Sequence, residues 1–194
     1  MNKLLIIPAL FMLGGCVNQS VTQNKDVQPK ILSQEESIKA DAINKINDFV
    51  NLIKPLLMSS LKADPTGESG MDMCSASAQE LTKDYNKKLS SDIKIRRTAI
   101  KYRNVLNKPD NIDKQVMNQM IASKSISPVM IKTKNGYRVY QPLANLQPCL
   151  ACHGDMNTMN PKTVAKIKKY YPKDLANGFK LNDFRGVVVA EIKK

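Results

Sequence analysis

Three residues near the C-terminal end of the chain carry the clearest chemistry: Cys149, Cys152 and His153, in the order C-x-x-C-H. Two thiols separated by two residues can each form a thioether with one vinyl group of a haem. The adjacent histidine then lies beneath the porphyrin, where its imidazole can ligate the iron. The pattern therefore predicts one covalently attached c-type haem, with His153 as the proximal ligand.

The same residues permit two other interpretations, a disulfide between Cys149 and Cys152 or part of a zinc site. Zinc normally takes four Cys or His ligands, and only Cys74 remains once an N-terminal cysteine is assigned to a lipid. A thioredoxin-like redox motif belongs near a βαβ pattern, whereas this motif follows a predicted hairpin. His153 is the only histidine of the chain, and its place directly after the second cysteine favours haem.

Residues 1–15 have the pattern of a bacterial lipoprotein signal peptide. Lys3 precedes an apolar run, Leu4–Met12, that is too short to span a membrane. Leu13-Gly14-Gly15-Cys16 then matches a lipobox, in which the Cys16 thiol takes the diacylglycerol; an ordinary secretory signal is the alternative. Val17 follows, not the aspartate typical of inner-membrane retention. We therefore expect a lipoprotein of the bacterial cell envelope, anchored in the outer membrane and facing the periplasm.

The rest of the chain divides into a tether and a domain. Residues 16–34 are polar and rich in Gln, Asn, Ser and Lys, a composition typical of a flexible linker. Residues 35–194 are long enough to form one domain with its own core.

Charge narrows the range of partners. The chain has 30 Lys and Arg against 17 Asp and Glu, a formal net charge of +13. Such a surface either serves solubility alone or steers the protein toward acidic partner proteins and anionic lipid head groups. Nucleic acid is not expected, because an export signal leads away from it and no stripe of aromatic and basic residues is present.

The N-terminal part of the domain is predicted to be helical. Ser33 and Glu36 have the spacing of a capping box, and apolar residues then recur at helical spacing to about residue 62, with a kink expected at Pro55. The apolar stripe of this helix indicates either core packing or the seam of a homodimer. A second helix is predicted over about 72–89, with Cys74 on its inward face.

Strands dominate the rest of the chain. Asn135-Gly136 predicts a hairpin between two strands, and the haem motif follows it directly. The predicted strands cover 93–98, 129–133, 137–141 and 186–192, and further helices cover about 111–123 and 161–170. Helices first and an antiparallel sheet later indicate an α+β fold.

The second axial ligand of the iron stays open on this reasoning. A single histidine excludes bis-histidine ligation within one chain. The candidates are Cys74, one of ten methionines, a lysine, or an open position. Met156 and Met159 lie close to the motif, and methionine is the usual partner in electron-transfer cytochromes c.

A longer ordered set of residues resembles the PAS-like c-type haem domain family, described in a cyanobacterial cytochrome and found in the sensory part of some histidine kinases. The resemblance covers about residues 35–192, and Val105 departs from it, because the family usually has proline after Arg-Asn. The matching residues are Cys74, Arg97-Thr98, Arg103-Asn104, Asn107, Pro109-Asp110, Tyr140, Pro142, Cys149–Gly154, Tyr171-Pro172, Gly178 and Asp183–Gly186.

The resemblance implies a PAS-like antiparallel sheet behind long N-terminal helices, and a haem with His and Cys axial ligands, here His153 and Cys74. A thiolate ligand stabilises ferric iron, so a low potential is expected, whereas methionine would raise it. Arg97 and Arg103 are candidates to lower the pKa of the thiolate or to pair with haem propionates. Surface salt bridges are the alternative role for both arginines.

Three functions follow as hypotheses. The first is a membrane-anchored periplasmic cytochrome that exchanges electrons with a redox partner protein at low potential. The second is a haem-based redox or gas sensor, in which Cys74 is displaced or oxidised and a membrane partner receives the signal. The third is a haem enzyme, which needs an open iron and distal acid–base groups. Because no second histidine can supply them, we expect an electron carrier or sensor and not an enzyme.

Overall fold

The computed structural model describes residues 33–194, which contain the whole predicted domain. The predicted signal peptide, the lipidation site Cys16 and nearly all of the tether lie outside the described residues. In chain order the elements are α1 (Gln34–Ala63), α2 (Glu68–Ala76), α3 (Ala78–Lys87), β1 (Ile93–Thr98), the 3-10 helix η1 (Val105–Asn107), α4 (Asn111–Ala122), β2 (Val129–Thr133), β3 (Gly136–Ala144), the 3-10 helix η2 (Gln147–Cys149), α5 (Leu150–His153), α6 (Pro161–Tyr170) and β4 (Phe184–Lys193).

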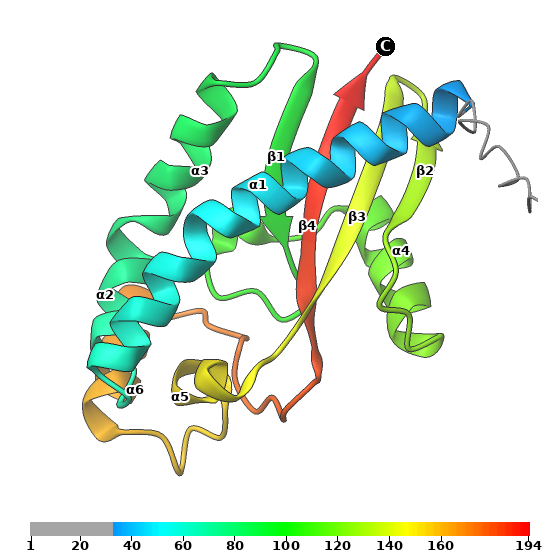
Figure 1. Cartoon of the computed structure of the whole chain (residues 1–194). Helices are drawn as coiled ribbons and strands as arrows, with labels where there is room; N and C mark the ends of the chain where they lie inside the picture. The colour runs from blue at the N-terminus through cyan, green and yellow to red at the C-terminus, as the bar shows by residue number, and fades with distance from the viewer. Residues whose placement is uncertain (1–32) are drawn as a thin grey trace, which may run out of the picture. The chain divides into compact units, whose positions relative to one another are not determined.

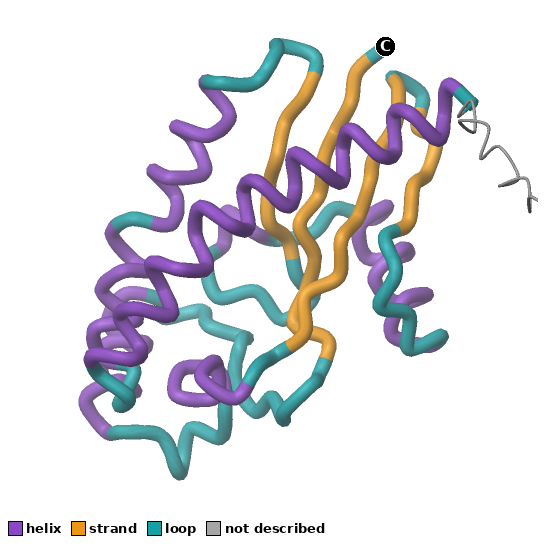
Figure 2. The backbone as a smooth tube through the Cα atoms, in the orientation of Figure 1, coloured by secondary structure: helices purple, strands orange, loops and turns teal. Residues whose placement is uncertain are grey.

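The four strands form one antiparallel sheet in the order β1-β4-β3-β2. The hairpin predicted at Asn135-Gly136 joins β2 to β3, with Thr133 opposite Gly136. The last strand, β4, lies between β1 and β3 and pairs with both. The sheet with helices on its two faces confirms the α+β prediction (Figures 1 and 2).

Helix α1 begins as predicted. The Ser33 hydroxyl accepts a hydrogen bond from the Glu36 amide, and the Glu36 carboxylate accepts one from the Ser33 amide, which completes the capping box. The helix continues through Pro55 and crosses one face of the sheet (Figure 1). Its buried residues Ala42, Ile46 and Phe49 pack against side chains of β1, β3 and β4.

The prediction of one helix over 72–89 is wrong, because two helices, α2 and α3, cover this stretch and meet at Ser77. Ser77 stays in the right-handed helical region, but its φ of −108° departs from the usual helical value; its amide donates to the Met73 carbonyl and its carbonyl accepts from Leu81. Helical hydrogen bonding thus continues on both sides of the break, which explains why the apolar spacing looks unbroken in the sequence. The turn between α1 and α2 ends at Gly67.

The opposite face of the sheet is covered by α4. Val116, Met117 and Met120 of this helix pack with Tyr140, Val187 and Val189 of the sheet. Because successive strand residues point to opposite faces, neighbouring positions of β4 serve the two cores in turn: Val188 packs toward α1 and Val189 toward α4.

A third cluster lies outside the sheet, where α1, α2, α5 and α6 meet. Its buried members are Leu61, Met71, Cys152, Met159 and Ile167. This cluster joins the C-x-x-C-H motif to the N-terminal helices. None of the helices within residues 33–194 is long and apolar enough to cross a bilayer.

Candidate functional site

A cavity of about 430 Å³ lies between α1, α2, one face of the sheet and the C-x-x-C-H segment. Its volume falls in the range of roughly 300–1,000 Å³ that small-molecule and cofactor sites occupy. Phe49, Ile53 and Leu57 of α1 form part of its apolar wall. The predicted residues Cys74, Arg97, Arg103, Cys149, Cys152 and His153 all line it.

The C-x-x-C-H segment forms the two short helices η2 and α5, so both cysteines and the histidine fall within little more than one helical turn after Pro148. Cys152 is buried, and its thiol lies 3.4 Å from the Gly67 carbonyl oxygen. Gly67 adopts φ +88°, and a Cβ there would lie 2.8 Å from the Cys152 sulfur. A residue without a side chain therefore lets the turn before α2 approach the motif.

His153 is held as a neutral imidazole. Its Nδ1 lies 2.7 Å from the Ala176 carbonyl oxygen. Because a carbonyl can only accept, Nδ1 carries the proton and Nε2 keeps the lone pair that a metal needs. Burial lowers the pKa of His153 well below its usual range, and the positive charges of Arg185 and Arg103 add to the effect. The ring of Phe179 packs edge-on against the imidazole.

Cys74 reaches the same cavity from α2. Burial raises the pKa of its thiol, while Arg97, Arg103 and Arg185 act in the opposite direction. Burial has the larger effect, so the free thiol is protonated. A metal ion bound to it would remove that proton, because coordinating thiols are deprotonated.

The charges that line the cavity are all positive: Lys54, Arg97, Arg103 and Arg185 contribute to the wall, and no Asp or Glu does within the described residues. The buried Nε of Arg97 has no hydrogen-bond partner, although its Nη2 donates to the Ala78 carbonyl at 3.1 Å. Burial lowers the pKa of Arg97, and burial beside Arg103 lowers the pKa of Arg185 to about 10. Cations held in this way would gain from an anionic ligand.

The structure gives no support to the disulfide and zinc alternatives. Cys74, Cys149 and Cys152 are all free thiols. Across residues 33–194, no three side chains of His, Cys, Asp or Glu are grouped so as to hold a metal ion by themselves. The methionines nearest in sequence do not line the cavity: Met159 is buried in the cluster around Leu61 instead.

Several residues of the site carried no assigned role in the sequence analysis. Met58 and Met71 line the cavity, and the Met71 sulfur accepts a hydrogen bond from Arg103 at 3.2 Å. Arg185, at the start of β4, also lines the cavity. In the sequence it belongs only to the Asp183–Gly186 motif of the family resemblance. Ala176 acts through its backbone, which no sequence signal reveals.

Fold and cavity define an α+β domain with a cation-lined site beside a C-x-x-C-H segment. The chain belongs to the Tll0287-like family, whose model matches residues 18–192. Among solved structures it is similar to the cyanobacterial heme-protein Tll0287, with 25% sequence identity and a TM-score of 0.65; the match covers 84% of this chain and 98% of that one. No curated protein sequence matches the chain.

Proposed function

We propose that this protein is a c-type haem protein that transfers electrons at low potential. One haem would be attached through Cys149 and Cys152, with His153 and Cys74 as axial ligands. One observation carries the proposal: the attachment motif and the distant Cys74 line the same cavity. The similarity to a cyanobacterial heme-protein and the family membership support it, and on the same grounds we propose that the sheet is PAS-like.

The residues present fit such a cofactor. The wall formed by α1 would offer apolar side chains to a porphyrin face, while Arg97, which has no ion pair among the described residues, would suit a propionate or a ligand thiolate. The unpartnered Nε of Arg97 is one donor that an anionic group could satisfy. When bound, the haem would supply a reversible one-electron couple.

The chain's own residues set the conditions of that couple. The Ala176 carbonyl holds the proton on Nδ1 of His153 and leaves Nε2 for the iron. The Cys74 thiolate adds a negative charge that favours the ferric state, so we expect a low potential. Arg97 and Arg185 lie close enough to affect the pKa of this thiol and therefore moderate that effect.

A haem-based sensor is the second candidate, and one observation favours it. Cys74 lies on α2, a helix of nine residues that follows Gly67 and ends at the break before α3. Loss of the Cys74 ligand would free the short helix α2 from the iron without disturbing a longer helix. Such a helix could transmit a ligand change to a membrane partner.

The cellular setting is also a proposal. We place the protein in the bacterial cell envelope, anchored through Cys16 to the outer membrane and facing the periplasm. Its redox partner would present an acidic surface to this basic chain. The exposed Leu52 and Leu56 of α1 are available for a homodimer contact.

The test begins with protein produced in cells that have cytochrome c assembly machinery. We expect a covalent adduct with the mass of one haem, lost when Cys149 and Cys152 are both replaced by alanine. Colourless protein of polypeptide mass would overturn the haem assignment. Cys74→Ala should change the Soret band and the EPR spectrum of the ferric form, whereas Ser75→Ala, one residue along the same helix, should not.

Carbon monoxide and nitric oxide separate the two functions. An electron carrier keeps both axial ligands after reduction, so neither gas should change the spectrum. Rapid binding of either gas by the reduced wild-type protein would instead favour the sensor. An unchanged ferric spectrum in Cys74→Ala would show that the assignment of Cys74 is wrong.

A further inference from the structure

Arg103 is buried, with only 8% of its surface exposed, and its guanidinium is committed to protein groups. Its Nε donates to Asp174 Oδ1 at 3.0 Å, and its Nη2 lies 3.3 Å from Asp174 Oδ2. The same Nη2 donates to the Cys152 carbonyl at 2.6 Å and to the Ala176 carbonyl at 3.0 Å. Arg103 therefore ties the attachment segment to the loop that follows α6.

The Ala176 carbonyl connects the Arg103–Asp174 pair to His153. It accepts from His153 Nδ1 at 2.7 Å and from Arg103 at the same time. The Ala176 amide in turn donates to Asp174 Oδ1 at 2.9 Å. Both polar groups of one peptide residue are thus fixed by the Arg103–Asp174 pair.

The surrounding backbone reinforces the contact between the loop and the motif. The Gly178 amide donates to the Gly154 carbonyl at 2.6 Å, and the Phe179 amide donates to the His153 carbonyl at 2.9 Å. The Arg103–Asp174 pair, whose members are 71 residues apart in sequence, adds side-chain bonds to these backbone contacts. Among the described residues, the pair with Arg103 is the one ion pair that the loop after α6 makes.

We infer that Arg103 and Asp174 form a positioning clamp for His153, in which the Ala176 carbonyl orients the imidazole toward the iron. This inference rests on the proposed haem function. It gives Arg103 a positioning role in place of propionate binding and leaves the unpartnered Nε of Arg97 as the better donor to an anionic group. A ligating histidine needs such an outer partner to hold its tautomer and its ring orientation.

The test uses the haem-loaded protein and the variants Arg103→Lys, Arg103→Gln and Asp174→Asn. Lysine keeps the charge of Arg103 but cannot make the fork of hydrogen bonds. The control is Lys173→Gln, which removes an exposed positive charge next to Asp174 in the same loop and does not touch the cavity wall. Two readouts report on the histidine itself: the exchange rate of its Nδ1 proton by NMR and the g-values of the ferric EPR spectrum.

We expect Arg103→Lys and Arg103→Gln to exchange the Nδ1 proton roughly tenfold faster than wild type, the factor that corresponds to the loss of one or two buried hydrogen bonds. Both should also shift the EPR g-values, and Asp174→Asn should do the same to a smaller extent. Lys173→Gln should leave both readouts unchanged. If Arg103→Gln gives no folded protein, the lysine and Asp174→Asn variants decide the question.

Wild-type exchange and g-values in Arg103→Lys would overturn the clamp, as would equal changes in Lys173→Gln. These outcomes differ from a failure of the haem proposal. In that case the wild-type protein itself would carry no covalent haem, and no variant could be compared.

Discussion

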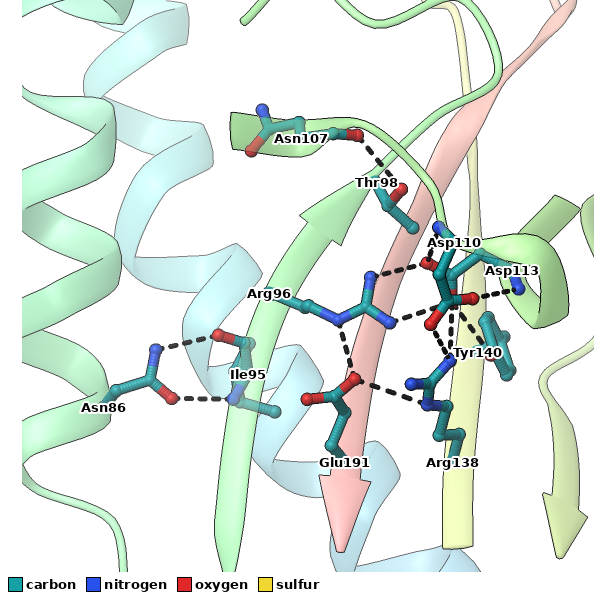
Figure 3. A network of polar contacts seen from close by, with 10 residues as sticks. All are labelled: Asn86, Ile95, Arg96, Thr98, Asn107, Asp110, Asp113, Arg138, Tyr140 and Glu191. Carbon is teal, nitrogen blue, oxygen red and sulfur yellow. Dashed lines mark hydrogen bonds and ion pairs between the residues drawn. The ribbon is translucent and has the colours of Figure 1, made fainter. Parts of the chain in front are cut away.

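The two faces of the sheet treat buried charge in opposite ways. On the face covered by α4, Asp113 is 1% exposed and accepts from both Nη atoms of Arg96, at 2.9 and 2.8 Å. Tyr140 and Arg138 donate to the same carboxylate at 3.0 and 3.2 Å. Figure 3 shows these side chains converging from β1, β3 and α4.

On the face covered by α1, the cavity wall has cations and no carboxylates. Arg97 follows Arg96 directly in β1, and strand alternation turns it toward the cavity. Its Nε lacks a partner, whereas Nε of Arg96 donates to Glu191 at 2.9 Å. Of these two adjacent arginines, Arg96 donates through all three guanidinium nitrogens, whereas Arg97 donates from Nη2 to the Ala78 carbonyl and leaves its Nε unpartnered.

The difference indicates that Arg96 stabilises the fold, whereas Arg97 has a free donor for a bound group. On the α4 face, the hydrogen bonds among Arg96, Asp113, Arg138 and Tyr140 attach α4 to the sheet and engage all three nitrogens of the Arg96 guanidinium. A buried cation without a partner is costly by itself, so a protein keeps it where a bound group supplies the missing charge. The comparison of the two faces therefore agrees with the proposal that an anionic group binds on the α1 face.

The strongest test replaces each of the two arginines by methionine in the haem-loaded protein. Arg96→Met should lower the free energy of unfolding by about 3 kcal/mol, the lower end for breaking a buried pair, since Asp113 keeps Arg138 and Tyr140. The haem spectrum and midpoint potential should not change. Urea denaturation and redox titration measure the two quantities.

Arg97→Met is the matched variant. It should leave stability nearly unchanged and alter the midpoint potential. It loses one hydrogen bond to the Ala78 carbonyl, which still accepts from Thr82 Oγ1 at 2.7 Å, so the stability loss should stay below about 1 kcal/mol. The midpoint potential should fall, because a positive charge beside the ligand site is removed. Equal losses of stability with an unchanged potential in both variants would abolish the distinction between the faces.

The second prediction concerns the close approach of the α2 turn to the motif. Gly67→Ala should lower stability by about 1–2 kcal/mol through its left-handed backbone, and its Cβ would also press on the Cys152 sulfur. We therefore expect part of the protein to carry haem on Cys149 alone. Pyridine haemochrome spectra distinguish one thioether from two.

Gly178→Ala provides the control for that variant. Gly178 is also left-handed, at φ +67°, but a Cβ there would meet only Lys101 Nζ, at 3.9 Å. Its loss of stability should be similar, with both thioethers intact. Single attachment in Gly178→Ala as well would mean that stability, and not contact with Cys152, controls haem attachment.

Local signals explain how much of this fold the sequence could predict. The capping box at Ser33 and the Asn-Gly turn each depend on a few neighbouring residues, and both are present as predicted. β3 was predicted to end at Gln141, yet it runs on to Ala144. Pro142 is tolerated because β2 has already ended, so that only β4 pairs with it.

The site was predictable where its residues carry chemistry in their own side chains. The spacing of Cys149, Cys152 and His153 is a local signal, and Cys74 could be placed on an inward helix face. Asp174 and Ala176 could not be found, because they belong to an irregular loop without periodicity. Their roles depend on contacts with Arg103 and His153 that only the folded chain creates.

The smallest effect concerns Asp64, which supports the same turn before α2. Its carboxylate accepts from the Thr66 amide at 3.1 Å and the Ser69 amide at 2.9 Å. Hydrogen bonds, first of all that from the Thr66 hydroxyl, lower the pKa of Asp64 from 3.8 to about 2. Because the folded pKa lies below the unfolded one, this contribution to stability is complete above pH 3.8 and is lost as the pH falls toward 2.

Asp64→Asn should be slightly less stable than wild type at pH 6, and the two should converge near pH 2. A constant difference in unfolding midpoints between pH 6 and pH 2 would show that the carboxylate stays equally ionised in both states and does not hold the turn.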